Sequence, residues 1–499
     1  MSKSMPFELR YLDINWGPDE AKDDKMLTDY FVEFPEYNEI LPGNKRYIIG
    51  RKGTGKSAIL TKIRLECQSN SSYFHGDISL RDFPLADFRT LGDRSQQNKA
   101  KFVAIWKFLL FTEIAQLITK EQTNSDSGAL QELRQFLKVN FPDGISIANT
   151  VTTLRANGSK VSLNMSTQSC EDSEETNCQV VGQVHYNRAV KHLEELFTKI
   201  HSPSTYVLLI DELDEGYKAK DTDLNLVILS LLRATDEIYH FFKNHQINCL
   251  PILALRSDIF DSLNDNDLNK LDDYILRLSW TTDENSPWSL KQIAEKRIEA
   301  AVKKKYPDLT INDYWSLVAD DNSAPKGLWQ YLCVLTFSRP RDIVKLLKYC
   351  SKSIKQDKLD FSCVQSIEPE YSKWFAKEFR DEVQSFMSCW NAALMCLAEI
   401  GQGKEKVVRL IQCLETNSEV EKWCISNKKT AIDIVKLLFN YSVIGCVNSS
   451  GRWIFKYKDE DFEYLPSYPN YCVHYGFCKK LRIPKSYDRF IIDIIRDYN

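Results

Sequence analysis

Residues 47–59 read YIIGRKGTGKSAI and constrain the possible folds of this chain more than any other stretch. An apolar run comes first, as expected for a short buried strand, and a helical pattern follows. Four positions between them fit the pattern Gly, any four residues, Gly, Lys, then Ser or Thr: Gly50, Gly55, Lys56 and Ser57. Since both the motif and its strand–loop–helix context are present, the sequence predicts a phosphate-binding loop here.

The residue types in this loop each suit a nucleotide. Gly50, Gly53 and Gly55 allow positive φ angles and a close approach of the backbone to phosphate oxygens. The start of the following helix favours an anion. Lys56 is expected between the β- and γ-phosphates of ATP, and the hydroxyl of Ser57 is expected on Mg²⁺. We expect the nucleotide to contact nine successive residues: Gly50, Arg51, Lys52, Gly53, Thr54, Gly55, Lys56, Ser57 and Ala58.

Length and composition set broad limits. A chain of 499 residues is long enough for two to four domains. A hydrophobic content of 43% and a charged content of 27% are typical of globular proteins. The net charge of −4 argues against a surface that is basic throughout, so charge alone does not imply nucleic acid binding.

The chain gives no sign of export or of a membrane span. Its beginning lacks the apolar segment of a secretory signal, and the most apolar run, residues 102–118, is interrupted by Lys107 and Glu113 and predicts a buried helix. Fourteen cysteines without a Cys-x-x-Cys pair are typical of reduced thiols in a cytoplasmic protein. One cluster offers zinc-ligand types without an obvious fourth ligand, and core packing explains it better: Cys472, His474 and Cys478.

A second motif follows a continuous apolar run. Residues 206–210, YVLLI, predict a strand buried on both faces of a parallel sheet, and Asp211 and Glu212 come directly after it. Ligands bind at the carboxyl ends of such strands. We therefore expect Asp211 to hold Mg²⁺ and Glu212 to accept a proton from the attacking water, although a solvated acidic turn would have the same composition.

Two arginines follow at informative places. Residues 248–255 predict another buried strand that ends at Arg256, which could reach a γ-phosphate or could pair with Asp258 or Asp261. Residues 274–278 predict a last strand. Arg341 lies in the first turn of a helix predicted to begin near Pro340, where an arginine could close over the nucleotide.

The order of these features resembles the AAA+ ATPases and their STAND relatives, and in particular a family of bacterial P-loop ATPases with the same Gly-Arg-Lys-Gly-Thr-Gly-Lys-Ser loop. The resemblance covers roughly residues 40–480. It implies an α/β fold with a five-stranded parallel sheet, in which the P-loop strand lies between the last strand and the Arg-tipped strand, followed by a helical lid. By matching, it places Arg256 at the sensor-1 position and Arg341 at sensor 2.

The long interval between Lys56 and Asp211 departs from simple AAA+ modules. We interpret residues 121–184 as an insertion that contains a β-hairpin turning at Asn157 and Gly158, between the runs VTTLRA and SKVSLNMS. Helices are predicted at 96–119 and 188–200, and a strand at 72–79. For an arginine finger that acts on another subunit, we can name only two candidates: Arg233 and Arg277.

The C-terminal part predicts helices at 386–400, 404–414 and 430–440, then two short strands at 442–447 and 452–457. Helices followed by a strand pair are typical of a winged helix, which could bind DNA or serve only in protein packing. Basic residues that could contact phosphates are partly offset by acidic neighbours: Lys428, Lys429, Lys436, Arg452, Lys456, Lys458, Lys479, Lys480 and Arg482.

The predicted organisation has five parts. These are an N-terminal extension that packs on the nucleotide domain (1–40), the P-loop ATPase domain (41–280), the helical lid (281–380), the winged-helix-like domain (381–485) and a C-terminal tail (486–499).

The sequence predicts a cytoplasmic ATPase and molecular switch of the AAA+/STAND type. The resemblance suggests self-association or a partner effector protein, and a role in bacterial defence against foreign DNA. Two alternatives stay open: a DNA-binding initiator or loader controlled by ATP, and an interaction scaffold that holds nucleotide without turnover. A small-molecule kinase fits less well, because adjacent Asp211 and Glu212 suit water activation.

Overall fold

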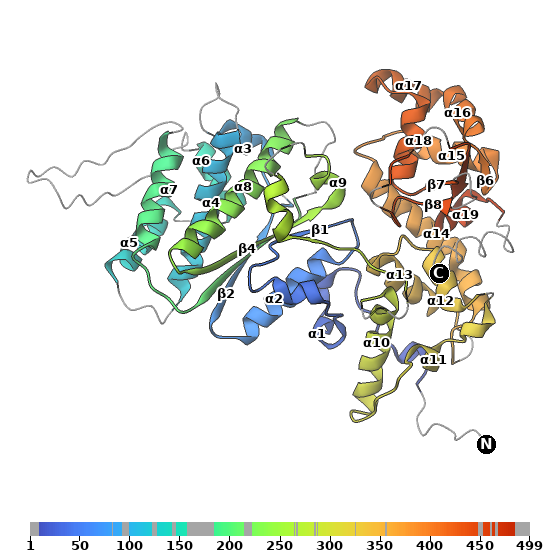
Figure 1. Ribbon diagram of the computed structural model, residues 1–499, viewed down its shortest axis with the longest axis horizontal. Helices are drawn as coiled ribbons and strands as arrows, with labels where there is room; N and C mark the ends of the chain where they lie inside the picture. Colours follow the sequence, from blue (N-terminus) through green and yellow to red (C-terminus); the bar gives the residue numbers. More distant parts are fainter. Residues whose placement is uncertain are drawn as a thin grey trace, which may run out of the picture. The chain divides into compact units, whose positions relative to one another are not determined.

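A computed structural model describes residues 9–81, 83–91, 99–121, 127–141, 146–156, 184–213, 222–263, 265, 268–283, 286, 288–324, 326–354, 357–447, 453–459, 462–464 and 468–484 (Figure 1). The chain forms two compact units. The sheet unit contains residues 35–51 and 56–278. The helical unit contains residues 1–34, 52–55 and 279–499.

A five-stranded parallel sheet organises the sheet unit, with the order β2-β3-β4-β1-β5. The P-loop strand β1 lies between β4, the Arg-tipped strand, and β5, the last strand, which confirms the predicted arrangement. This order and the loop after β1 give the chain the α/β fold of a P-loop NTPase. The strand bounds are β1 (Tyr47–Gly50), β2 (Tyr73–Ser79), β3 (Thr205–Asp211), β4 (Asn248–Arg256) and β5 (Ile275–Arg277).

The strand register brings the motifs to one edge of this sheet. Gly50 lies beside Arg256, and Ser79 lies beside Asp211. All four residues of β1 and nearly all of β3 and β4 are buried, as their continuous apolar sequences predict.

Helices cover both faces of the sheet, with α2 on one side and α4 and α8 on the other (Figure 1). The central helix α4 is long and apolar enough to cross a membrane, but 78% of its most apolar stretch is buried within the fold, as expected for a core helix. The helices of this unit are η3 (Pro35–Glu39), α2 (Lys56–Ser69), α3 (Leu85–Thr90), α4 (Lys99–Lys120), α5 (Gly128–Asn140), α6 (Ile147–Ala156), α7 (Val184–Phe197), α8 (Thr222–Asn244), α9 (Ser257–Phe260) and η4 (Leu268–Tyr274).

The first half of the predicted hairpin was wrong. The run VTTLRA belongs to helix α6, in which Ile147, Val151 and Leu154 are buried at helical spacing. The alternation of β-branched residues suggested a strand, but the apolar stripe begins earlier, at Ile147, and has the period of a helix. The turn at Asn157 and Gly158 and the second run lie outside the described residues.

The prediction that the N-terminal extension, residues 1–40, packs on the nucleotide domain was wrong for most of its length, since only residues 35–40 belong to the sheet unit. The described residues up to Phe34 belong to the helical unit. Tyr11, Trp16 and Val32 are part of its hydrophobic core, and the Tyr11 hydroxyl donates to the Leu347 carbonyl at 2.9 Å. Aromatic content predicted burial but did not identify which surface would cover these side chains.

The helical unit contains the region of the predicted lid and the C-terminal part. Pro340 begins α13 at its first position, as predicted, since proline lacks the N–H that a helix start leaves unpaired. The helices are η1 (Tyr11–Asp13), η2 (Ala21–Asp23), α1 (Leu27–Tyr30), α10 (Leu290–Lys305), α11 (Trp315–Val318), η5 (Asp321–Ser323), α12 (Leu328–Val334), α13 (Pro340–Cys350), α14 (Phe361–Val383), α15 (Trp390–Ile400), α16 (Val407–Thr416), α17 (Ser418–Asn427), α18 (Ala431–Asn440) and α19 (Tyr475–Leu481).

A four-stranded antiparallel sheet, order β6-β9-β7-β8, lies in the C-terminal part of this unit. The strands are β6 (Lys404–Lys406), β7 (Ile444–Val447), β8 (Trp453–Ile454) and β9 (Asn470–Val473). Helix α18 and the pair β7–β8 confirm the predicted helix and strand pair of a winged-helix-like arrangement. The helix predicted from residue 404 begins only at Val407, because the alternating sequence Lys-Glu-Lys pairs with β9 instead.

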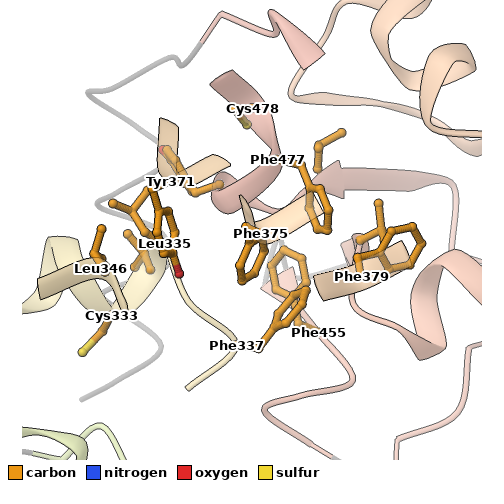
Figure 2. Packing of buried hydrophobic residues seen from close by; sticks show 14 of the residues in the cluster. Cys333, Leu335, Phe337, Leu346, Tyr371, Phe375, Phe379, Phe455, Phe477 and Cys478 are labelled. Atoms are coloured by element: carbon orange, nitrogen blue, oxygen red, sulfur yellow. The ribbon is translucent and has the colours of Figure 1, made fainter. Parts of the chain in front are cut away.

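An aromatic cluster fixes the start of α13 within the helical unit (Figure 2). Phe337 packs against Phe375 of α14, with ring centroids 4.4 Å apart, and Phe477 of α19 packs against both rings. Gly476 allows this close approach, since a β-carbon there would lie 2.5 Å from the Phe375 ring. The cluster holds the segment that leads into α13.

His474 lies in the same core and is 2% exposed. Its Nδ1 accepts from the Gly476 amide at 3.1 Å, and its Nε2 lies 3.2 Å from the Thr336 carbonyl, so the neutral ring satisfies both contacts. Burial, together with nearby Lys458, lowers the pKa of His474 to about 3. Cys472 and Cys478 are also buried, which confirms their interpretation as core cysteines.

Candidate functional site

The predicted phosphate-binding loop joins β1 to α2. Gly53 and Gly55 have φ angles of +83° and +103°, as predicted for this loop. Gly50 was also expected at positive φ, but it is the last residue of β1 and has extended backbone. The left-handed region is therefore needed only after the chain leaves the strand.

Lys56 is the first residue of α2. Its ammonium donates to the carbonyls of Gly50 at 2.9 Å and Arg51 at 3.1 Å, so the side chain folds back over the loop. Its predicted contact with the β- and γ-phosphates stays a prediction, as do the nucleotide contacts of the other residues in the range 50–58.

Ser57 and Asp211 are in contact, although they are 154 positions apart in sequence. The Ser57 hydroxyl donates to Asp211 Oδ2 at 2.8 Å. A hydroxyl and a carboxylate are oxygen ligands of the kind that Mg²⁺ prefers, so the pair fits the predicted metal site. Ser57 is exposed and Asp211 is partly exposed, so this pair lies at the surface of the sheet unit.

Glu212 follows Asp211 in a left-handed conformation, with φ +64°, which is uncommon for a residue with a side chain. Its backbone N–H donates to Asp211 Oδ1 at 2.8 Å. Its carboxylate accepts a 2.5 Å hydrogen bond from Ser79 and lies 3.2 Å from the Arg81 guanidinium. The backbone thus aims the Glu212 side chain at the carboxyl end of β2.

Sequence reasoning missed Ser79 and Arg81. The sequence contained a signal for both residues. The strand predicted at 72–79 ends at Ser79, and in a parallel sheet its carboxyl end lies at the same edge as Asp211, where ligands bind.

Arg256 ends β4 beside Gly50, but its side chain has a partner. Its Nε donates to Asp258 Oδ1 at 2.9 Å, and its Nη2 contacts the other oxygen of that carboxylate. Of the alternatives that the sequence left open for Arg256, the structure shows the ion pair with Asp258. The structure thus places the backbone of Arg256 next to the loop and its guanidinium on Asp258.

Arg341 contacts the tip of the loop. Its backbone N–H donates to the Gly53 carbonyl at 3.2 Å, and its guanidinium lies 3.3 Å from Glu378. Glu378 also lies 3.3 Å from the ammonium of Lys52. Residues 52–55 belong to the same compact unit as Arg341 and Glu378, so these contacts lie within one unit.

Arg339, which sequence reasoning missed, is a buried charged group that contacts the loop. It is 2% exposed and pairs with both oxygens of Asp342, at 2.9 and 3.0 Å, and with Glu382 at 2.6 Å. Burial alone would lower the pKa of Arg339, but the two carboxylates raise it above its ordinary value. Its Nη1 also donates to the Lys52 carbonyl at 3.0 Å. The sequence signal for this ion pair was the position of Asp342, three residues after Arg339 at the start of a predicted helix.

One further hydrogen bond holds the loop tip, and a pocket lies beside Arg341. The indole N–H of Trp280 donates to the Thr54 carbonyl at 2.8 Å. A pocket of about 190 Å³ is lined by Pro18, Asp19, Glu20, Arg341, Val344, Lys345, Trp374 and Glu378.

The candidate finger arginines both have local partners. Arg233 pairs with Glu237 and Arg277 with Asp261, each at 3.0 Å. About half of each arginine side chain is exposed. Their proposed action on another subunit stays a prediction.

A family model described as the FunZ-associated C-terminal helical domain matches residues 288–380. This range contains Arg339, Arg341 and Glu378. The lid-like helices of this chain are thus similar to a domain that recurs in other proteins.

The chain is similar in sequence to the putative transposon gamma-delta 80.3 kDa protein of Escherichia coli (strain K12). The two are 26% identical over 363 residues, which is 69% of this chain and 46% of that protein. The chain therefore spans about half the length of the curated relative it matches.

Two solved structures align over most of the chain. One is described as the structure of Drosophila ORC bound to DNA, with 10% identity, 96% of this chain and 94% of that chain covered, and a TM-score of 0.25. The other is the Aeropyrum pernix ORC2 protein in ADPNP-ADP complexes, with 11% identity, 98% of each chain covered and a TM-score of 0.29. Because both scores are low, the fold assignment rests on the sheet order and the loop.

Proposed function

We propose that this protein binds and hydrolyses ATP and acts as a molecular switch of the AAA+/STAND type. The observation that carries this proposal is the 2.8 Å contact between Ser57 and Asp211, which joins the loop motif to the Asp-Glu motif. The two motifs were identified independently in the sequence, and a folded ATPase needs them together.

Each group at the loop has one task in binding. The loop amides and the start of α2 receive phosphate oxygens. Lys56 leaves the carbonyls of Gly50 and Arg51 and moves to the β- and γ-phosphates. Ser57 and Asp211 would hold Mg²⁺, which would neutralise phosphate charge.

Glu212 is the proposed general base. Its carboxylate accepts a proton from a water positioned beside the γ-phosphate. Ser79 and Arg81 hold the carboxylate in the described state, and release of at least one of these contacts frees an oxygen for the water. The rate of turnover therefore depends on these two residues as well as on Glu212.

Arg256 and Arg341 are the proposed contacts to the γ-phosphate. Arg256 would exchange Asp258 for the phosphate, and Arg341 would exchange Glu378 for it. Loss of the γ-phosphate on hydrolysis would release both arginines, which is the proposed switch. Self-association, a partner effector and a role in defence against foreign DNA remain suggestions of the family resemblance, and the ATPase activity is proposed independently of them.

A second candidate function is DNA binding controlled by ATP. Helix α18 exposes Ile432, Lys436 and Asn440 at helical spacing, next to the strand pair β7–β8 in sequence. Lysine and asparagine can contact phosphates and base edges. This candidate predicts salt-sensitive DNA binding that is lost when Lys456 and Lys458 are both changed to Glu.

Steady-state release of phosphate from ATP tests the proposal, with wild type compared with Lys56→Ala and Glu212→Gln, each with and without duplex DNA. Loss of turnover in both variants supports the ATPase, and stimulation by DNA favours the initiator function. Nucleotide that is retained in a Lys56-dependent way without turnover favours the scaffold. If neither turnover nor retention is found, the proposal fails.

A further inference from the structure

Three consecutive carbonyls at the loop tip each accept a hydrogen bond from a donor within residues 279–499. Arg339 Nη1 donates to the Lys52 carbonyl at 3.0 Å, and the Arg341 backbone N–H donates to the Gly53 carbonyl at 3.2 Å. The Trp280 indole N–H donates to the Thr54 carbonyl at 2.8 Å. All these residues belong to the helical unit.

We call these three hydrogen bonds the anchors of the loop. Because the peptide bond is planar, they also fix the direction of the loop N–H groups. In a planar trans peptide, the C=O of one residue and the N–H of the next point in opposite directions. When the carbonyls of Lys52, Gly53 and Thr54 are held, the N–H groups of Gly53, Thr54 and Gly55 point away from the anchors. Phosphate-binding loops use successive amides of this kind to receive phosphate oxygens.

The first anchor is rigid because Arg339 is itself held on several sides. Asp342 accepts from its Nε and Nη2, and Glu382 accepts from its Nη1. The guanidinium also lies over the Phe337 ring, 5.0 Å from its centroid, next to the aromatic cluster. Movement of the Lys52 anchor would therefore require rearrangement of a buried ion network.

The middle of the loop is also closely packed. Gly53 has φ +83°, and a β-carbon there would lie 3.1 Å from Arg341 Cβ. By contrast, a β-carbon on Gly55 would meet nothing within 4 Å. The loop is thus tightly held on the side of Gly53 that faces Arg341.

We infer that Arg339 and Trp280 are positioning residues that preset the loop amides for the phosphates of a nucleoside di- or triphosphate. This inference rests on the proposed function and assigns to these residues a role that differs from γ-phosphate sensing. They act through the loop backbone, so they affect ADP, which has no γ-phosphate, as well as ATP.

Titration calorimetry with ADP tests this role. Trp280→Phe removes one N–H donor and keeps most of the ring, and Trp288→Phe is the matched control, because Trp288 is 40% exposed. Trp280→Phe is expected to weaken ADP binding roughly three- to tenfold, the effect of one hydrogen bond, and Trp288→Phe to leave it within about twofold. Thermal unfolding without nucleotide should show Trp280→Phe folded, with a midpoint lowered by no more than the loss of one hydrogen bond allows, and weaker ADP binding by this folded protein separates positioning from a general structural role.

Arg339→Lys provides a second variant. Its ammonium can still pair with Asp342 and Glu382, but it lacks the planar fork that also reaches the Lys52 carbonyl. We expect weaker ADP binding in this variant as well. If ADP affinity in both variants equals that of wild type, the inference is overturned while the ATPase proposal stands. If wild type itself binds no ADP or ATP, the proposed function fails, and the inference fails with it.

Discussion

The residues around the loop are held differently in the sheet unit and in the helical unit. In the sheet unit, Ser57, Asp211 and Glu212 are exposed or partly exposed, and a ligand can replace the contacts described for them. In the helical unit, Arg339 and Asp342 are almost fully buried and form an ion pair, and Glu382 is a second partner of Arg339. The difference indicates that the groups proposed to hold Mg²⁺ and to act as the base stay accessible, whereas Arg339, which holds the loop, is fixed by buried carboxylates.

Glu212→Gln is expected to have the largest effect, on activity alone. An amide of the same shape cannot accept the proton, so turnover of ATP should fall about 10²- to 10⁴-fold. ADP affinity and the free energy of unfolding should stay close to wild type. Single-turnover phosphate release, ADP titration and urea unfolding measure these three quantities, and turnover at the wild-type rate would remove Glu212 from the role of base.

Arg339→Ala should show the opposite pattern, a loss of stability. It leaves Asp342 and Glu382 as buried charges without their cation, which costs about 3–5 kcal/mol in the free energy of unfolding. Arg380→Ala on α14 is the matched control, since Arg380 pairs with Asp381 at the surface and should contribute less than about 1 kcal/mol. Urea unfolding measures both variants, and equal effects would contradict the contrast between locked and accessible charges.

His474 predicts that acid destabilises the helical unit. Its pKa is about 3 in the fold and about 6.5 when unfolded, so the unfolded chain binds more protons between these values. The stability that neutral His474 contributes is present above about pH 6.5 and decreases by about 2 kcal/mol from pH 7 to pH 5. Urea unfolding at the two pH values should show this loss in wild type and a smaller one in His474→Gln. The same loss in both proteins would assign it to other groups.

Glu113 predicts a smaller effect of opposite sign in the sheet unit. Burial raises its pKa to about 7, so the folded state binds more protons than the unfolded state above the ordinary pKa near 4.3. The contribution of protonated Glu113 to the free energy of unfolding is therefore lost as the pH rises. The loss is about 1 kcal/mol from pH 6 to pH 7. Glu113→Gln should remove this part of the pH dependence in urea unfolding. An unchanged slope would show that Glu113 is ionised in the fold.

Local sequence signals were enough to predict the strands of the parallel sheet and the part of the candidate site that contains Ser57, Asp211 and Glu212. The loop motif, the apolar strands and the acidic pair are each contained within a few residues, and the family resemblance added the strand order. The residues that hold the loop depend on contacts between distant parts of the chain. Arg339 and Lys52, for example, are 287 positions apart. No local pattern specifies such a pair, and the same limit explains why the burial partner of the N-terminal aromatics was predicted wrongly.

Calorimetric titration of ATP with Mg²⁺, with wild type compared with Lys56→Ala, tests the central claim most directly. The predicted result is one binding site in wild type, with affinity lost at least about tenfold in Lys56→Ala while the thermal unfolding midpoint without nucleotide is unchanged. Absence of binding in wild type, or equal binding in both proteins, would contradict the assignment of this loop as a nucleotide site.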